Sequence, residues 1–357
     1  MDLHVAVTVS MLGVSRARAS AVFKELRQRD AAVTAVEVLA ALGIPAGDRA
    51  SLHETARKAA AAAISAGIGA GMQPVPWFDP RYPSLLNCIP DPPPVLWTSG
   101  NPDVLSQPAV AIVGSRSATP YALDVAGRLA GELAARGVVV VSGLARGVDS
   151  AAHRGTLHVH GVTVAVLGSG LDRVYPAEHE PLARSIAAGG LVVSELGPGG
   201  PPLAEHFPLR NRIISGVSLA VVVVEASEKS GSLITARCAM EQGRDVMAVP
   251  GSVLSGRNRG SHSLLKDGAK VVETADDVLE ELGWPAARAA TQQPRTAASE
   301  DPLLAHMEPG EVYELDALVA ATGTAPSKLL PRLMELELLG RVRAAGGRFG
   351  RATGRPV

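Results

Sequence analysis

The run Leu219-Ala-Val-Val-Val-Val224 is apolar throughout, and it closely follows the mixed stretch Phe207-Pro-Leu-Arg-Asn-Arg-Ile-Ile-Ser-Gly216. A strand without polar alternation is buried on both faces, as in a parallel sheet covered by helices. The preceding stretch combines an aromatic ring, two guanidinium groups and an amide, which an ordinary core does not need. Arginine offers planar donors to phosphate oxygens, and phenylalanine offers a face to a base. The two segments therefore predict a buried strand with a site for a nucleotide or a single-stranded nucleic acid at its mouth.

Further short apolar runs occur before and after this one, separated by amphipathic segments. Buried strands that alternate with helices are typical of a parallel sheet covered on both faces, so we expect a doubly wound, mostly parallel α/β fold. Ligands of such sheets bind outside the carboxyl ends of the strands, which directs the search for function to the loops after the runs. The other runs are Ala109–Val113, Val138–Val141, Thr163–Leu167, Leu191–Val193, Asp245–Val249 and Lys270–Val272.

The region before the sheet divides into two parts. Residues 1–75 are alanine-rich with helical spacing, which predicts a small helical domain of the SAM or helix-hairpin-helix type. Within it, Leu12-Gly-Val-Ser-Arg-Ala-Arg18 fits either a degraded helix-hairpin-helix turn that meets a DNA phosphate or a helix that ends at Gly13. Residues 74–100 are dense in proline, which predicts a rigid, extended connector leading into the sheet domain of residues 76–284.

Two further segments are expected after the sheet. Residues 285–302 lack periodicity and large apolar side chains, which predicts a flexible linker. Residues 303–357 predict three helices and a hairpin that turns at Gly346-Gly347, the plan of a winged helix. Winged helices serve protein contacts as well as DNA binding, so this fold alone does not choose between the two.

Composition limits the possible partners. With 357 residues, 46% apolar and 19% charged, the chain has room for a large core, and its formal net charge of −1 requires any nucleic-acid site to be a local patch. Cys88 and Cys238 are too few for a four-ligand zinc site and are expected to be buried free thiols, and neither a metal nor a cofactor is expected. Because no run of about 18 apolar residues could cross a bilayer, we expect a cytoplasmic protein without membrane insertion.

Glycine- and serine-rich turns with cations follow several of the runs. Gly114-Ser115-Arg116 is either a phosphate cradle or an ordinary strand-to-helix turn with a solvated arginine. Ser142-Gly-Leu-Ala-Arg-Gly-Val-Asp149 contributes Gly143, whose missing side chain suits a turn pressed against a ligand. Lys229 opens another polar turn, Lys-Ser-Gly-Ser. Because such turns recur at several strand ends, one shared pocket is favoured over chance placement of helix caps.

Enzymatic motifs are weak by comparison. Asp149 and His153 share one face of an expected helix, where they fit either an acid/base pair or, as we expect, a carboxylate that braces the loop beside a hydrogen-bonded histidine. Gly168-Ser-Gly170 lacks the third glycine of the dinucleotide fingerprint, and the sequence contains neither the P-loop pattern nor Gly-x-Ser-x-Gly. Nicotinamide and ATPase chemistry are therefore not expected.

Eight motifs in order along about 200 residues carry a resemblance to one family. They are Tyr82-Pro-Ser-Leu-Leu86, Asp91-Pro-Pro-Pro-Val-Leu96, Val113-Gly-Ser-Arg116, Ser142-Gly-Leu-Ala-Arg-Gly-Val-Asp149, Tyr175-Pro176, Phe207–Gly216, Ser230-Gly-Ser-Leu-Ile-Thr-Ala236 and Val249-Pro-Gly251. Taken together, these motifs resemble the DprA/Smf family of DNA-processing proteins. The resemblance implies an extended Rossmann-like domain that binds single-stranded DNA, forms a homodimer, and loads the RecA recombinase during natural transformation. Such a protein is a recombination mediator and not an enzyme.

The resemblance also implies a set of site residues. Arg210 and Asn211 are expected to position the phosphates of a strand, Phe207 to be a platform for a base, and Arg212 to brace the loop that contains them. At His262 many members of the family have asparagine instead. Carried over by position, the DNA pocket falls on Gly114, Ser115, Arg116, Phe207, Arg210 and Asn211, with Lys229 as an addition.

The sequence is also compatible with two other functions. A Rossmann-class hydrolase that cleaves nucleoside monophosphates at the glycosidic bond would use Glu225 or Glu195. Such enzymes usually display Pro-Gly-Gly-x-Gly-Thr, where this chain has Ser-Gly-Ser-Leu-Ile-Thr. A DNA-binding regulator would instead act through residues 303–357.

Overall fold

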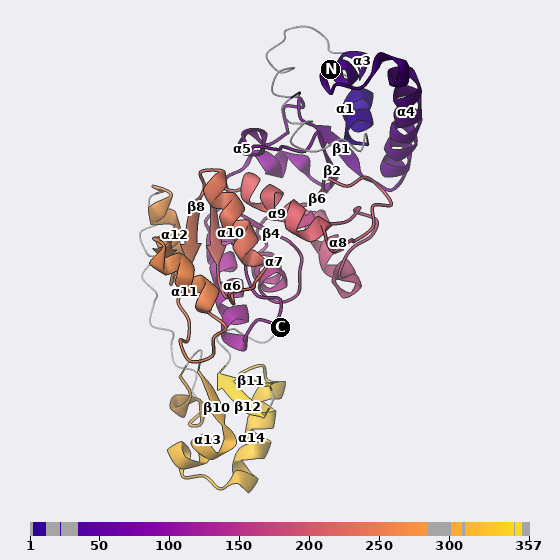
Figure 1. Ribbon diagram of the computed structural model, residues 1–357. Helices are drawn as coiled ribbons and strands as arrows, with labels where there is room; N and C mark the ends of the chain where they lie inside the picture. Colours follow the sequence, from indigo (N-terminus) through magenta and orange to yellow (C-terminus); the bar gives the residue numbers. More distant parts are fainter. Residues whose placement is uncertain are drawn as a thin grey trace.

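The computed structural model of the chain describes residues 3–11, 22, 35–284, 301–308, 311–345 and 347–351. Figure 1 shows N-terminal helices, a central α/β body and a small C-terminal unit in succession along the chain. The described N-terminal helices are α1 (Leu3–Ser10), α3 (Ala35–Ala41) and α4 (Ala46–Gly69). Alanines on one side of α4 pack with α1 and with Trp97 of the central body. The turn expected at Leu12–Arg18 lies outside the described residues.

A nine-stranded sheet forms the centre of the molecule, with the order β1-β2-β6-β5-β4-β3-β7-β8-β9. The strands from β6 to β9 in this order are parallel. All seven apolar runs are strands, which confirms the predicted doubly wound fold. The bounds are β1 (Gln73–Pro76), β2 (Val95–Gly100), β3 (Ala109–Val113), β4 (Val139–Ser142), β5 (Thr163–Leu167), β6 (Leu191–Ser194), β7 (Ala220–Val223), β8 (Asp245–Ala248) and β9 (Lys270–Val271).

The proline-rich residues 74–100 are not the connector that the sequence predicts. They include β1 and β2, which add an antiparallel edge to the sheet through the pairing of β2 with β6. A short helix, α5 (Ser84–Asn87), lies between the two strands. The prolines of β1 are tolerated because β1 is the outermost strand, where a missing backbone N–H breaks no ladder.

Helices cover both faces of the sheet. Residues of α6, α7 and α12 share one apolar cluster with alternate residues of β3, β4 and β7, and residues of α9, α10 and α11 share the cluster on the other face. The stretch Phe207–Gly216, which the sequence predicts to include a loop, lies within α9. The bounds are α6 (Pro120–Ala135), α7 (Val148–His158), α8 (Glu180–Gly189), α9 (His206–Gly216), α10 (Ser232–Glu241), α11 (Arg259–Lys266) and α12 (Ala275–Glu281).

Strand order reverses at β3. From β3 the chain proceeds through β4 and β5 to β6, and it then returns to place β7 on the opposite side of β3. The loops after β3 and β7 therefore diverge to opposite faces and leave a crevice outside their carboxyl ends, which is where doubly wound sheets bind ligands.

The C-terminal unit has the predicted winged-helix fold. Its three strands pair antiparallel in the order β10-β12-β11, and Leu318, Leu333 and Phe349 contribute to its core. Residues 285–300 of the expected linker lie outside the described part of the chain. The elements are η3 (Leu304–His306), β10 (Val312–Glu314), α13 (Leu315–Thr322), α14 (Pro326–Leu338), β11 (Val342–Ala345) and β12 (Arg348–Arg351).

Two expectations from composition can be compared with the structure. Cys88 is exposed and Cys238 is partly buried, so the expectation of two buried thiols is wrong. Cys88 caps the C-terminus of the short helix α5, in which only Leu86 is buried. None of the helices in the described ranges combines the length and the apolar character needed to cross a membrane.

Helices α6 and α7 cross in close contact because glycines line their interface. A Cβ atom on Gly155 of α7 would lie 2.6 Å from both the Cα and the carbonyl carbon of Gly127 in α6. Backbone atoms cannot move aside as the end of a flexible side chain can, so even one methyl group must separate the two helices.

Gly155→Ala is expected to lower the free energy of unfolding by about 1–3 kcal/mol, the usual cost of overpacking. Urea unfolding followed by circular dichroism measures the change. Gly189→Ala is the matched control, because a Cβ there meets no heavy atom within 4 Å. Equal stability of the two variants would contradict the close crossing of α6 and α7.

Candidate functional site

A pocket of about 470 Å³ lies at the carboxyl ends of β3 and β7, where the strand order reverses. The loops after β3, β4 and β7 line it together with α9 and the first turn of α10. Gly143, the eighth predicted residue, lines a smaller adjoining hollow of about 40 Å³. The predicted residues that line the main pocket are Gly114, Ser115, Arg116, Phe207, Arg210, Asn211 and Lys229.

Backbone hydrogen bonds hold the loop after β3 in place. The Ser115 N–H donates to the carbonyl O of Glu225 at 2.7 Å, and the Ser115 carbonyl accepts from the N–H of Val148 at 3.2 Å. A Cβ on Gly114 would lie 2.6 Å from the Val148 side chain, so glycine is required for this close packing. The loop thereby presents the exposed side chain of Arg116 from a fixed backbone.

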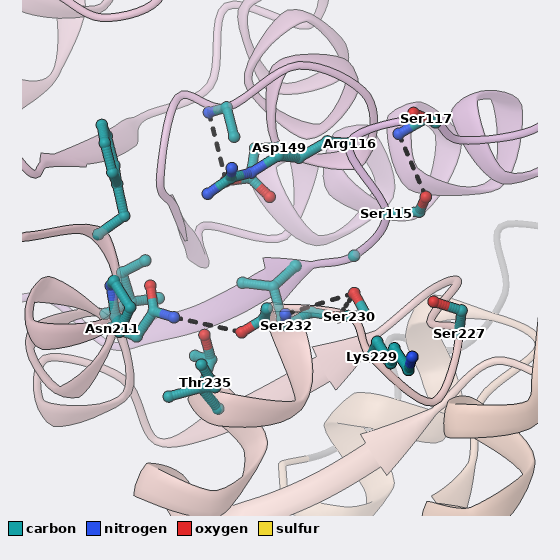
Figure 2. A pocket seen from close by; sticks show the side chains of 18 of the residues that line it. Ser115, Arg116, Ser117, Asp149, Asn211, Ser227, Lys229, Ser230, Ser232 and Thr235 are labelled. Carbon is teal, nitrogen blue, oxygen red and sulfur yellow. Dashed lines mark hydrogen bonds between the residues drawn. The ribbon is translucent and has the colours of Figure 1, made fainter. Parts of the chain in front are cut away.

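The opposite wall is the turn between β7 and α10. Figure 2 shows Lys229 and Ser230 on this wall, across the pocket from Ser115 and Arg116. The hydroxyls of Ser230 and Ser232 lie 2.7 Å apart at the start of α10. The N-terminus of α10 is the positive end of the helix dipole, which attracts anions, and the exposed ammonium of Lys229 adds a full positive charge beside it.

A third cation, Arg257, closes the rim of the pocket and was not predicted as a site residue. Its Nη1 donates to the carbonyl O of Ser117 at 2.9 Å, which joins the loop after β8 to the loop after β3. The only signal in the sequence is a further turn with arginine and glycine after an apolar run. Among the described residues that line the pocket, Asp149 alone is acidic. The pocket therefore carries an excess of positive charge although the whole chain has a net charge of −1.

Arg210 does not extend into the pocket as expected for a phosphate contact. Its side chain is 6% exposed, and its Nη1 donates to the carbonyl oxygens of Gly143, at 2.7 Å, and Val166. Burial lowers the pKa of Arg210 to about 10. Gly143 is glycine because a Cβ there would lie 2.5 Å from the Arg210 guanidinium carbon, so its close approach is to this side chain and not to a ligand. Arg210 thus braces α9 against the ends of β4 and β5.

Asn211 and Arg212 also hold the wall together. The Asn211 Nδ2 donates to the carbonyl O of Gly231 at 3.3 Å, which ties α9 to the turn before α10 (Figure 2). Arg212 forms ion pairs with Asp91 and Glu195, each at 2.8 Å, as the bracing role predicted for it requires. Asn211 is buried as well, so its contacts give it a supporting place in the wall.

Asp149 braces the loop after β4, as expected. Its carboxylate accepts from the N–H groups of Gly143, at 3.1 Å, and Ala145, at 3.3 Å. Burial raises the pKa of Asp149, and the positive charge of Arg210 acts against that rise. The carboxylate is therefore committed to the loop.

His153 is fully buried and is not among the residues that line the pocket. Its Nδ1 lies 2.7 Å from Thr163 Oγ1, and that hydroxyl donates its own proton to the Val140 carbonyl O at 2.6 Å. The Nδ1 atom must therefore carry the proton that it donates to Thr163. Burial, reinforced by Arg210, lowers the pKa of His153 to about 3, so the ring is neutral at physiological pH. Asp149 and His153 do not form an acid/base pair.

The two glutamates of the hydrolase alternative are engaged elsewhere. Glu225 is buried, and its carboxylate accepts from Thr119 Oγ1 at 2.6 Å. Thr119 in turn caps α6. Glu195 is paired with Arg212. Neither carboxylate lines the pocket, so neither of these glutamates is placed beside a ligand there.

His262, the departure from the family pattern, lies in α11 and does not line the pocket. Its Nε2 lies 3.0 Å from the carbonyl O of Gly251, where an N–H on that atom is the donor. The imidazole therefore ties α11 to the loop after β8 that carries Arg257. No group of three or more potential metal-ligating side chains occurs within the described ranges.

Comparison with known proteins gives a consistent result. A family model described as DNA recombination-mediator protein A matches residues 73–283, and a model of the DprA winged helix domain matches residues 287–348. Protein Smf of Escherichia coli (strain K12) is 41% identical over 280 residues, which cover 76% of this chain and 75% of that protein.

Two solved structures are similar in fold and sequence. DNA processing protein A from Streptococcus pneumoniae has a TM-score of 0.71 at 37% identity and covers 79% of this chain and 98% of its own. DNA processing protein A from Helicobacter pylori, described for its single-stranded DNA binding mode, has a TM-score of 0.54 at 30% identity. That match covers 59% of this chain and 95% of the Helicobacter pylori chain.

The buried neutral His153 predicts a specific acid sensitivity. Its pKa of about 3 in the folded chain lies below the value of about 6.5 in an unfolded chain. As the pH falls below 6.5, the unfolded state binds the proton first, and the folded state loses stability until the pH reaches about 3. Between pH 7 and pH 5 the wild type should lose about 2 kcal/mol more than His153→Gln does.

Urea midpoints at the two pH values measure this difference. His158→Gln changes an exposed histidine on the same helix and should keep the wild-type pH dependence. If His153→Gln also retained it, the assignment of a neutral buried imidazole would be wrong.

Proposed function

The chain belongs to the DprA/Smf family of DNA-processing proteins, as its motifs predict, and from this premise we propose that it binds single-stranded DNA in the pocket at β3 and β7. We further propose that it protects incoming DNA and loads RecA onto it during natural transformation. The observation that carries the proposal is the convergence of Arg116, Lys229 and Arg257 with a helix N-terminus in one crevice. The single-stranded DNA binding mode described for the Helicobacter pylori relative supports it.

The proposed contacts are tolerant of sequence. Exposed cations and backbone N–H groups recognise phosphates, which every nucleotide carries, and aromatic rings stack on any base. Gly114 and Ser115 shape the backbone of the phosphate site, and Arg116 and Lys229 supply its charge. Arg210, Asn211 and Gly143 contribute by fixing the wall that holds Phe207 in place.

The hypothesis of a recombination mediator fits the chemistry of the pocket better than the hypothesis of a hydrolase does. A glycosidic-bond hydrolase needs a carboxylate positioned at the sugar, and both candidate glutamates are held in contacts away from the pocket. Loading a recombinase requires no bond to be broken. The proposal also includes a homodimer formed through the Rossmann-like domain, a surface for RecA, and action in the cytoplasm.

The C-terminal unit is not required for DNA binding in this proposal. The described cations of the site all lie between β3 and α11, within the central body. Residues 303–357 of the winged-helix domain are then free for another contact.

Arg116→Ala should weaken single-stranded DNA binding roughly tenfold, because one charge-assisted phosphate contact is lost. It should also lower the slope of log affinity against log salt by about 0.7. Fluorescence anisotropy with a labelled oligonucleotide at several salt concentrations measures both quantities. Arg184→Ala is the control, because Arg184 is exposed on α8 and does not line the pocket. Unchanged affinity in both Arg116→Ala and Phe207→Ala proteins would show that the site is assigned incorrectly.

The loading activity is tested by strand exchange with RecA on DNA coated by single-strand binding protein. Wild-type protein should shorten the lag before exchange, since it would deliver RecA to occupied DNA, and Arg116→Ala should shorten it less. Reactions without RecA control for exchange by the protein itself. No effect on the lag at a concentration that saturates the DNA would contradict the loading role while leaving DNA binding intact.

A further inference from the structure

A second hollow continues the main pocket on the side of α9 that faces the loop after β5. The two hollows share Arg116, Ala145, Phe207 and Arg210 in their walls, so they meet at the Arg116 and Phe207 side chains. The remaining wall of the second hollow includes Tyr175 and Arg146. These two adjoining hollows are together called the cleft below.

Phe207, the expected base platform, is already covered on much of its surface. The ring packs against Gly168: a Cβ atom added to Gly168 would lie 3.0 Å from the Cδ1 atom of Phe207. The Arg116 guanidinium carbon lies 5.6 Å from the centre of the ring, a distance typical of a cation–π contact. A base that stacks on the face of Phe207 beneath Arg116 must displace that guanidinium.

Tyr175 is the more accessible ring. Its residue is 46% exposed, and its ring centre lies 5.3 Å from that of Phe207 at an interplanar angle of 46°. One side of Tyr175 is therefore supported by Phe207 and Pro176 lies next to it, while much of the ring remains open to the cleft. An exposed aromatic ring in a positively charged hollow offers a face on which a base can stack.

Arg146 places a positive charge at this end of the cleft. Its Nε pairs with Glu178 at 2.5 Å, and both side chains are more than half exposed, at 59% and 52%. An exposed pair of this kind contributes little to stability, so a phosphate can replace Glu178 as the partner of Arg146 at small cost. Charge and aromatic surface thus occur together at Tyr175 as they do at Arg116.

We propose that Tyr175 is a base-stacking residue of the single-stranded DNA site, with Arg146 as its phosphate contact. The strand then runs from Lys229 and Arg257 past Arg116 to Tyr175. This inference rests on the proposed function and adds to its site two residues that lie in family motifs but were not predicted as site residues. The loop after β5 becomes part of the DNA-binding surface.

Tyr175→Leu removes the aromatic face but keeps an apolar side chain of similar reach. It should raise the Kd for single-stranded DNA by about 5- to 150-fold, and the salt slope should not change because no charge is lost. Tyr175→Phe keeps the face and should bind as the wild type does. Phe78→Leu, at an exposed aromatic that lines neither hollow, is the control for a general effect of removing a surface ring.

A strand of the same length with abasic sites separates stacking from a structural effect. On this strand the wild type and Tyr175→Leu should bind equally, because there is no base to stack. An equal loss on both kinds of strand would overturn the stacking role, since it would show damage to the cleft itself. Full affinity of Tyr175→Leu for natural DNA, with Arg116→Ala weakened, would overturn the inference and leave the proposed function standing. Failure of the wild type to bind single-stranded DNA would overturn both.

Arg146→Gln tests the phosphate contact at the same end. It should lower the salt slope by about 0.7, as the loss of one contact to single-stranded DNA does. Arg184→Gln is a matched control, because Arg184 pairs with Glu180 on the surface in the same way but lies outside the cleft. Equal salt slopes for the two variants would show that the strand does not reach Arg146.

Discussion

The buried guanidinium of Arg210 is the constraint on which the arrangement of the cleft depends. It donates to the carbonyl ends of β4 and β5, and Asp149 supplies the opposing negative charge from the start of α7. Removing one partner of a buried charge is strongly destabilising, so these elements keep a single relative position. Phe207 lies three residues before Arg210 on the same helix, and its place at the junction of the two hollows follows from this anchor.

Internal pairing of the carboxylates explains how a chain with a net charge of −1 forms a positive cleft. Glu225 is bonded to Thr119, Glu195 to Arg212, and Asp149 to the loop after β4. Each of these acids is used to hold a wall, and the cations at the rim of the main pocket remain exposed to solvent. The positive electrostatic field that attracts a DNA strand thus arises from the positions of the charged side chains and not from the net charge of the chain.

The interior strands were predictable because their signal is local. A parallel strand that is buried on both faces must be apolar throughout, so β3, β5 and β7 are visible as continuous runs. The edge strands were not predictable in this way. β1 has only four residues, two of them proline, and it is a strand through its pairing with β2, which in turn pairs with β6 about 95 residues further along the chain.

The sequence by itself determined the doubly wound fold, the winged helix and the family, and it identified the turns at Gly114, Gly143 and Lys229. Only the tertiary structure decided what each polar side chain does there. Arg116 and Arg210 are the same residue type in two predicted site motifs, yet one is exposed and the other is 6% exposed and bonded to strand ends. Tyr175 and Arg257 reach the cleft from loops more than 80 residues apart. The pattern of a buried strand depends on neighbouring residues and can be recognised in the sequence. The burial and the charge pairing of a side chain depend on segments that meet only when the chain has folded.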